Sequence, residues 1–469
     1  MQSHSLEGHG LRAWAKRIDL PLGIALVLLT VCVIGREWLP GSFVGEASPW
    51  LALACLVLLV PSATVTGIAF VVVGLVLTAI LATNGPDFVA VVTEGLALAA
   101  FIGAFFAALN TLRSAAQTSP AIHRCGAYLA HQPPGRRYGV LTLGGAAFSL
   151  VLNYGSIALL GSLATASAAE EKDPVIRPLR QRRMLVAVQR AFLAVLPWSP
   201  LSFAGAVTAS LVPGSTYVGV LLPCIGTGVL IAGTGWALDT IFKPRVAVRR
   251  PVERVGGPRD LKPLVILLVL MGTLILSLHF EFGVRVVGVV LLLVPLVSLG
   301  WLVIQGGPAS LGPRVRTYVG RELPGLRSEL VLLMMAGYIG KVGAALLVPL
   351  AARSGLDLGL VPGWVLLAGI VWLIPLTGMI GMNPILAASL LVPLMPAAGD
   401  DYSPTALFVA TTAGWAISGA TSPFTATTQL IGSFAQIPAA RVGLVWNGAY
   451  AIVTGVLVTA WVIFIDVAW

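Results

Sequence analysis

Long apolar runs separated by short polar segments make up most of the chain. Many of these runs are about 20 residues long, the length that an α-helix needs to cross roughly 30 Å of hydrocarbon. The pattern predicts an all-α membrane protein with about 11 transmembrane helices. Continuous helices are expected at 20–34, 88–110, 216–242, 263–278, 284–304, 328–348 and 442–465, and Pro61 is expected to divide 49–83 into two more.

Two apolar runs are interrupted near an asparagine and are expected to be re-entrant helical hairpins. The first, 138–169, has Asn153 at its break and basic segments on both sides, so a single crossing would leave one basic segment outside. The second, 361–396, has Asn383 at its break and lies between segments that are poor in Lys and Arg. The first hairpin is therefore expected to enter from the cytoplasm, and the second from outside.

Two further runs, 183–211 and 404–436, are interrupted by proline and are expected to cross the membrane as broken helices. Backbone groups that a break frees within hydrocarbon are tolerated only where protein or a water-filled cavity satisfies them. Paired interrupted segments of this kind are the best sequence sign of a transporter's binding site.

The interruptions recur in the same order in two halves of the chain. Asn153 precedes Asn383 by 230 residues, and Ser199 precedes Ser422 by 223. Because the two hairpins enter from opposite sides, the repeats are expected to have inverted topology. The expected domains are an N-terminal segment with the first helix (1–48), a first repeat (49–242), a cytoplasmic linker (243–262) and a second repeat (263–469).

Composition and charge agree with a membrane protein. The chain is 57% hydrophobic and 10% charged, whereas about a quarter of a soluble domain is charged. The net charge of +10 does not indicate nucleic-acid binding, because the basic residues cluster in segments that the positive-inside rule assigns to the cytoplasm, the N-terminus included. The arginine-rich segment 305–327 is expected to be one such loop.

Several classes of chemistry have no motif in the chain. There is no GxxxxGK[ST], HExxH or GxSxG, so neither an ATPase nor another enzyme is expected. The four cysteines lack CxxC spacing, which argues against a disulfide framework and a metal site. No cofactor is expected, and Na⁺ enters only as a candidate coupling ion.

Two segments of the second half resemble a known family. Gly381-Met382-Asn383-Pro384, with the apolar run after it, looks like the second Ser-Asn-Thr hairpin tip of the divalent anion/sodium symporters, a branch of the ion transporter superfamily. Ala420-Thr421-Ser422-Pro423-Phe424 looks like the Thr-Pro-Pro break in that family's last broken helix. The resemblance implies carriage of dicarboxylates or citrate, coupling to sodium, and a homodimer joined through scaffold helices.

Residues at the breaks are the expected ligands. Asparagine offers N–H donors to an oxyanion and an oxygen to a cation, and helix N-termini favour anions. Each residue also has a structural alternative: an interhelical hydrogen bond for the asparagines, and a bond to the same helix for the hydroxyls. The resemblance implies these roles at the breaks: substrate binding at Asn153, Gly155, Ser156, Asn383, Thr421 and Ser422, and ion binding at Asn153, Ser199, Asn383 and Thr421.

Lys341 and Glu94 are charged residues inside predicted spans, where charges are rare and costly. Lys341 is expected to meet an anionic substrate or to replace a coupling cation, and Glu94 to carry a proton or to pair with Lys341. A charge relay through these two residues therefore competes with a structural salt bridge and with an interfacial position for Glu94.

These observations predict a secondary active transporter of small anions, with organic carboxylates favoured, coupled to a Na⁺ or H⁺ gradient by alternating access. A hairpin-bearing domain, containing both hairpins and both broken helices, is expected to move against a scaffold of the helices at 88–110 and 328–348 and their neighbours. A cation/proton antiporter or a metalloid efflux carrier on the same fold, and a non-transporting membrane scaffold, are the alternatives. The expected partners are the anionic substrate and the lipid bilayer, and the expected location is a bacterial inner membrane.

Overall fold

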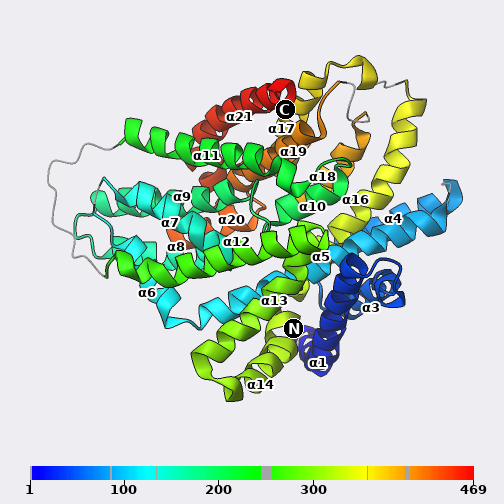
Figure 1. Cartoon of the computed structure of the whole chain (residues 1–469), viewed down its shortest axis with the longest axis horizontal. Coiled ribbons are helices and arrows are strands. Elements are labelled where there is room, and N and C mark those ends of the chain that lie inside the picture. Colours follow the sequence, from blue (N-terminus) through cyan, green and yellow to red (C-terminus); the bar gives the residue numbers. More distant parts are fainter. Residues whose placement is uncertain are drawn as a thin grey trace. The chain divides into compact units, whose positions relative to one another are not determined.

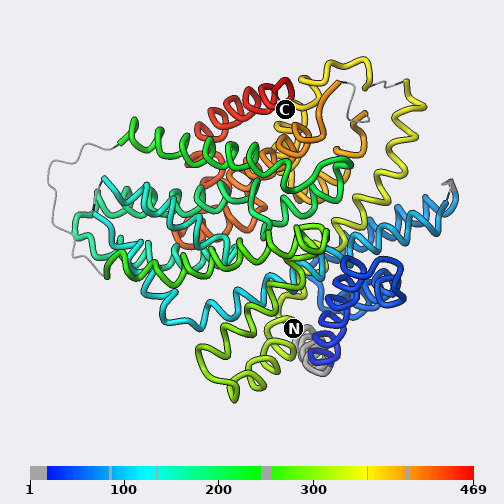
Figure 2. Tube along the Cα trace, in the orientation of Figure 1, coloured from blue at the N-terminus to red at the C-terminus, as the bar shows by residue number. Residues whose placement is uncertain are grey.

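The computed structural model describes residues 3–84, 87–133, 135–243, 256–355, 358–396 and 401–468, of which 3–17 and 84 are described by their backbone alone. All regular structure in these ranges is helical (Figures 1 and 2). Nine of the described helical segments are long and apolar enough to cross a membrane. Shorter apolar helices occur in pairs at 137–169 and 363–394. The predicted fold class, an all-α membrane protein, is confirmed.

The helices group into two compact units, and each unit takes segments from both halves of the chain. The first unit comprises Met1–Ala115 and Ile275–Leu356. Within it α16 packs along α3 and α4, and α1 packs against α3 and α13. Its helices are α1 (Ser3–Trp38), α2 (Phe43–Glu46), α3 (Ser48–Leu59), α4 (Val65–Asn84), nearly all of α5 (Phe88–Gln117), the end of α12 (Lys262–Phe282), α13 (Val286–Gly306), α14 (Pro308–Thr317), α15 (Leu323–Gly325) and α16 (Arg327–Arg353).

The second unit comprises Ala116–Leu274 and Asp357–Trp469. It holds both hairpins, α7–α8 and α17–α18, and both broken helices, α9–α10 and α19–α20. Both hairpins and both broken helices therefore fall in one unit, together with helices that the expected hairpin-bearing domain did not include. Movement of this domain against a scaffold stays a prediction. The helices of this unit are α6 (Pro120–Ala130), α7 (Arg137–Leu152), α8 (Tyr154–Ala169), α9 (Ile176–Val195), α10 (Phe203–Leu211), α11 (Tyr217–Ile241), most of α12, α17 (Gly363–Met379), α18 (Pro384–Leu391), α19 (Pro404–Thr421), α20 (Ala426–Ala435) and α21 (Gly448–Ala468).

The two halves of the second unit make equivalent contacts. The first helix of each hairpin packs on the first part of the broken helix that follows it, α7 on α9 and α17 on α19. The second helix of each hairpin packs on the second part of the opposite broken helix, α8 on α20 and α18 on α10. A shared apolar core, which includes Val220, Leu367, Phe408 and Val458, joins the two halves. These crossed contacts bring the interruptions of both halves into one body.

Two predictions about connecting segments have different outcomes. The segment 305–327, predicted to be a loop, is largely helical, because α14 is followed by a π-helical turn at Tyr318–Glu322 and by α15. Arg314 donates to Ser114 Oγ at 2.8 Å, which holds the basic segment against α5, and it lies 3.2 Å from Glu322 of the same segment. The segment therefore connects two candidate spans, as predicted, but it is largely helical and not an irregular loop. Most of the predicted linker, 244–255, lies outside the described residues.

Candidate functional site

The first hairpin turns at Asn153, the residue between α7 and α8. Its backbone angles are φ 50° and ψ −130°, a conformation that non-glycine residues rarely adopt. The Asn153 carbonyl accepts a hydrogen bond from Ser156 Oγ at 2.7 Å, and Gly155 and Ser156 are buried. The Asn153 side chain is half-buried and makes no capping bond to α8. The turn therefore presents an asparagine amide on a strained backbone.

Aromatic packing fixes this tip against the first broken helix. The Tyr154 ring lies 4.8 Å from the Phe192 ring of α9, centroid to centroid. Below the tip, Gly145 of α7 allows close approach to α9, since a Cβ there would come within 2.9 Å of Ala191. The local sequence thus positions Asn153 by small residues and one aromatic pair.

The second hairpin turns at Gly381, whose φ of 98° favours glycine. Asn383 then caps α18: its Oδ1 accepts from the Ile385 N–H at 2.8 Å, and Pro384 occupies the first helical position. Capping uses the side-chain oxygen of Asn383 and leaves its amide nitrogen available to donate. A ligand that meets this half-buried side chain at the nitrogen would be an acceptor, such as an oxyanion.

The break between α19 and α20 is held together by hydroxyl groups. Ser422 Oγ donates to the Gly378 carbonyl of α17 at 2.6 Å and accepts from the Phe424 N–H at 3.2 Å. Thr421 Oγ1 donates to the Ile417 carbonyl of its own helix at 3.0 Å. The Thr421 bond is the structural alternative expected for a hydroxyl, whereas Ser422 bonds to a different helix. Both hydroxyls are satisfied by the protein, so neither requires a ligand.

The break between α9 and α10 is a compact turn of the same kind. Ser199 is buried, and its Oγ accepts from the Leu201 N–H at 3.1 Å. Ser202 Oγ donates to the Leu196 carbonyl at 2.6 Å and caps α10 by accepting from the Gly205 N–H at 3.1 Å. The Ser199 hydroxyl therefore bonds within the break and not back to α9, and ion binding there stays a prediction.

Two buried hydroxyls at the second hairpin have no hydrogen-bond partner in the described part of the chain. They are Ser389 on α18 and Ser418 on α19. Ser418 Oγ lies against α17, since a Cβ added to Gly378 would come within 2.4 Å of it. Buried hydroxyls are usually paired, so each unpaired one marks free capacity for a water or a ligand. With the amides of Asn153 and Asn383, they are groups close to the hairpins that have capacity left, and Thr142 on α7 is a further buried hydroxyl without a partner.

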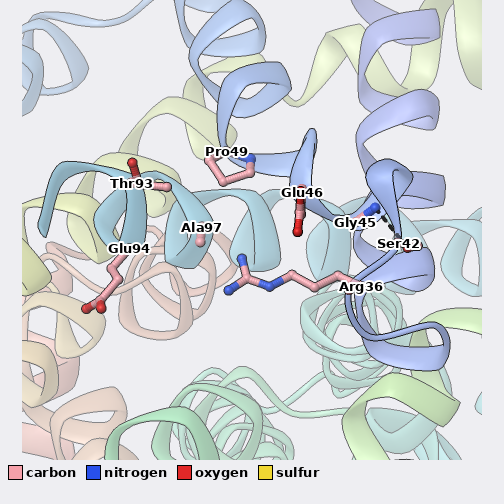
Figure 3. Close-up of a pocket in the computed structure, with 9 residues that line it drawn as sticks. Arg36, Ser42, Gly45, Glu46, Pro49, Thr93, Glu94 and Ala97 are labelled. Carbon is pink, nitrogen blue, oxygen red and sulfur yellow. Dashed lines mark hydrogen bonds between the residues drawn. The ribbon is translucent and has the colours of Figure 1, made fainter. Parts of the chain in front are cut away.

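Lys341 and Glu94 lie in the first unit, where they form an ion pair with 2.6 Å between Nζ and Oε2. Their side chains are 43% and 59% exposed, so this is the salt bridge that competed with a charge relay. Glu94 also borders a cavity of about 380 Å³, where Figure 3 shows it with Glu46 around the Arg36 side chain. A relay through the pair stays a prediction.

The sequence-based search missed Arg190 of α9. Among the residues that the structure describes, it is the least exposed charged one, with 6% of its surface exposed. The signal was present, because Arg190 follows the apolar residues 184–188 within a predicted span, where ionisable residues are rare. The prediction for 183–211 rested on the proline interruption of that run and did not include this residue.

No protein-family model matches the chain, and no curated protein matches it. Two solved structures share its fold. The YdaH transporter of Alcanivorax borkumensis is 19% identical, with a TM-score of 0.62 over 87% of this chain and 99% of that one. MtrF of Neisseria gonorrhoeae, one of a class of antimetabolite efflux pumps, is 15% identical, with a TM-score of 0.53 over 87% of this chain and 97% of that one. The chain therefore has the fold of two membrane transporters, and the finer resemblance to divalent anion/sodium symporters stays a prediction.

Proposed function

We propose that this protein is a secondary active transporter of small anions, with organic carboxylates as the favoured class. The observation that carries the proposal is the crossed arrangement in the second unit, where each broken helix packs on both hairpins. Interrupted helices of this kind expose backbone ends and amides to a solute within the membrane. The likeness to YdaH and MtrF adds support, because both are transporters.

The preference for anions rests on the groups that the hairpins leave available. The Asn383 nitrogen can only donate hydrogen bonds, and α18 directs its N-terminal amides to the same tip. Asn153 begins α8 in the equivalent place. The proposed mechanism is alternating access, in which the second unit carries the solute and a Na⁺ or H⁺ gradient supplies the energy.

The test is solute counterflow in proteoliposomes loaded with unlabelled succinate or citrate, which does not depend on the direction of transport in the cell. External labelled solute is expected to accumulate. Uptake is also measured with a Na⁺ gradient in one experiment and a pH gradient in a second, and one of the two gradients is expected to raise the rate of uptake. Empty liposomes give the background. Absence of counterflow for these solutes, for phosphate and for benzoate would contradict the proposal.

A second candidate is export of a toxic metabolite analogue, and the likeness to MtrF favours it. The same vesicles separate the two candidates. A carrier of carboxylates is expected to exchange succinate or citrate, whereas an exporter of this kind is expected to exchange a labelled antimetabolite and to leave the dicarboxylates behind.

A further inference from the structure

Arg190 is a buried positive charge that lacks a negative partner. No carboxylate among the described residues forms an ion pair with it. Its contacts are neutral: Nε donates to Asn447 Oδ1 at 3.1 Å, and Nη1 donates to the Tyr138 hydroxyl at 3.2 Å. The guanidinium also lies over the Tyr450 ring, 3.9 Å from its centroid. Buried charges in proteins are normally paired, so this one departs from the rule.

The contacts of Arg190 leave part of its guanidinium unused. The group has five N–H donors and no acceptor, and the bonds from Nε and Nη1 engage two of these donors. The remaining hydrogens are on Nη1 and Nη2, where two parallel N–H bonds form an edge that fits a carboxylate or another oxyanion. Tyr450 covers one face of the plane, and the unused hydrogens lie on an edge of the plane that this ring does not cover.

The neighbours of Arg190 link both halves of the second unit. Because Arg190 can only donate, Asn447 must present its oxygen to it and its nitrogen to Gln189 Oε1, at 2.9 Å. Gln189 Nε2 is then the atom that donates to the Gly419 carbonyl of α19, at 3.2 Å. This chain of bonds joins α9, one and a half turns before its break, to the last turn of α19 before the other break.

The charge is present in one repeat only. With the offset of 223 residues that relates Ser199 to Ser422, the position equivalent to Arg190 is Ala413 in α19. The unit therefore has one positive charge near the place where its two interrupted helices meet, and no equivalent charge on the other side of the repeat.

We infer that Arg190 binds the anionic group of the transported solute, a carboxylate or a similar oxyanion, through its Nη1 and Nη2 edge. The inference rests on the proposed function and adds to it a specificity-determining residue. The solute supplies a negative charge, because no described carboxylate of the protein pairs with Arg190. An empty carrier keeps one uncompensated charge, and a loaded carrier has none.

The test is thermal unfolding of the purified full-length protein in detergent, titrated with succinate, citrate, phosphate and benzoate at constant ionic strength. Succinamide, which lacks the charge, is the neutral control. The wild type is expected to be stabilised by at least one of the anions and not by succinamide. Arg190→Gln is expected to bind that anion about 10- to 100-fold more weakly, because it removes a charge-assisted pair of hydrogen bonds.

Arg182→Gln is the matched control, since Arg182 lies two turns earlier on α9 and packs over Trp446 instead. It removes the same charge and is expected to keep the wild-type response to anions. Arg190→Lys keeps the charge without the planar edge and is expected to retain part of the response. Without anions, Arg190→Gln is expected to unfold at the wild-type temperature or above, because the uncompensated charge is gone.

Each other outcome contradicts a specific claim. If Arg190→Gln responds to anions as the wild type does, the role of Arg190 is wrong and anion transport stands. If the anion-free variant unfolds well below the wild type, Arg190 is a structural residue and the inference is again wrong. If no anion stabilises the wild type, the inference and the proposed function both fail.

Discussion

Asn153 occupies backbone angles that glycine adopts far more easily, with φ 50° and ψ −130°. A non-glycine residue in such a conformation costs about 1–3 kcal/mol, and costs of this kind persist mainly at functional sites. The Asn153 side chain makes no capping bond that would offset the cost. At the scale of the single residue, the asparagine is better explained by a ligand than by the stability of the hairpin.

This explanation predicts opposite effects of Asn153→Gly on stability and on transport. The variant is expected to be as stable as the wild type or up to about 1 kcal/mol more stable, since strain is relieved while chain entropy rises. Counterflow of the substrate is expected to be lost with the side-chain amide. Asn153→Ala serves as the control, because it loses the amide and keeps the strain, and it is expected to be the less stable variant. Normal counterflow by Asn153→Gly would exclude Asn153 from the site.

Ser422 provides a prediction about stability alone. Its hydroxyl links α19 to the Gly378 carbonyl of α17, and interhelical hydrogen bonds in membrane proteins contribute about 0.6 kcal/mol on average and up to about 1.7. Ser422→Ala is expected to lower the free energy of unfolding by an amount in this range, measured by denaturant titration in detergent. Ser433→Ala, which removes an exposed bond to the same helix, is expected to change it little. Equal effects of the two substitutions would contradict the linking role of Ser422.

At the scale of elements, the sequence predicts where helices stop better than it predicts what their ends touch. A break depends on the residues at that point of the chain. Asn153, Gly381 and the prolines within the broken helices therefore mark the breaks in the sequence itself. The predicted hairpin 138–169 therefore agrees closely with α7 and α8. Helicity at 305–327 was missed because the charges of that segment suggest a loop, and the bond from Arg314 to Ser114 spans 200 residues.

The candidate site shows the same limit. Asparagine or serine at a break indicates a polar group, but only its neighbours decide whether that group is free. Ser422 is satisfied by Gly378, a residue 44 positions away that carries no polar side chain to suggest the contact. Gln189 and Asn447 are 258 positions apart, and their bond depends on the packing of two halves that the chain order separates.

The pairing of α5 with α16 gives a prediction at this scale. Glu94 and Lys341 are both substantially exposed, and exposed ion pairs contribute about 0.2–1 kcal/mol. A double-mutant cycle with Glu94→Gln and Lys341→Gln is expected to give a coupling free energy in this range, smaller at high salt. If the pair is only structural, both single variants keep the wild-type pH dependence of counterflow. A shifted pH profile in either variant, with stability unchanged, would instead support the charge relay.

For the whole molecule, the proposed mechanism requires that each unit behaves as one body. A cross-link that stays within a unit is then expected to leave transport intact. Positions 161 and 434 suit this test in the second unit, because a Cβ at Gly161 would come within 2.7 Å of the Phe434 ring, and two cysteines would replace that contact. In a background without the four native cysteines, the Gly161→Cys, Phe434→Cys variant is expected to transport equally before and after oxidation.

A second cross-link tests whether the first unit also moves as one body. Ile102 and Gly337 make the equivalent close contact between α5 and α16 in the first unit, where a Cβ on Gly337 would lie 2.4 Å from Ile102. Oxidation of Ile102→Cys, Gly337→Cys is likewise expected to leave counterflow unchanged. If joining α8 to α20 stopped transport while joining α5 to α16 did not, the first hairpin would have to move relative to the opposite broken helix. The solute would then pass by opening of the hairpin within the second unit, and displacement of that unit as a whole would no longer describe the mechanism.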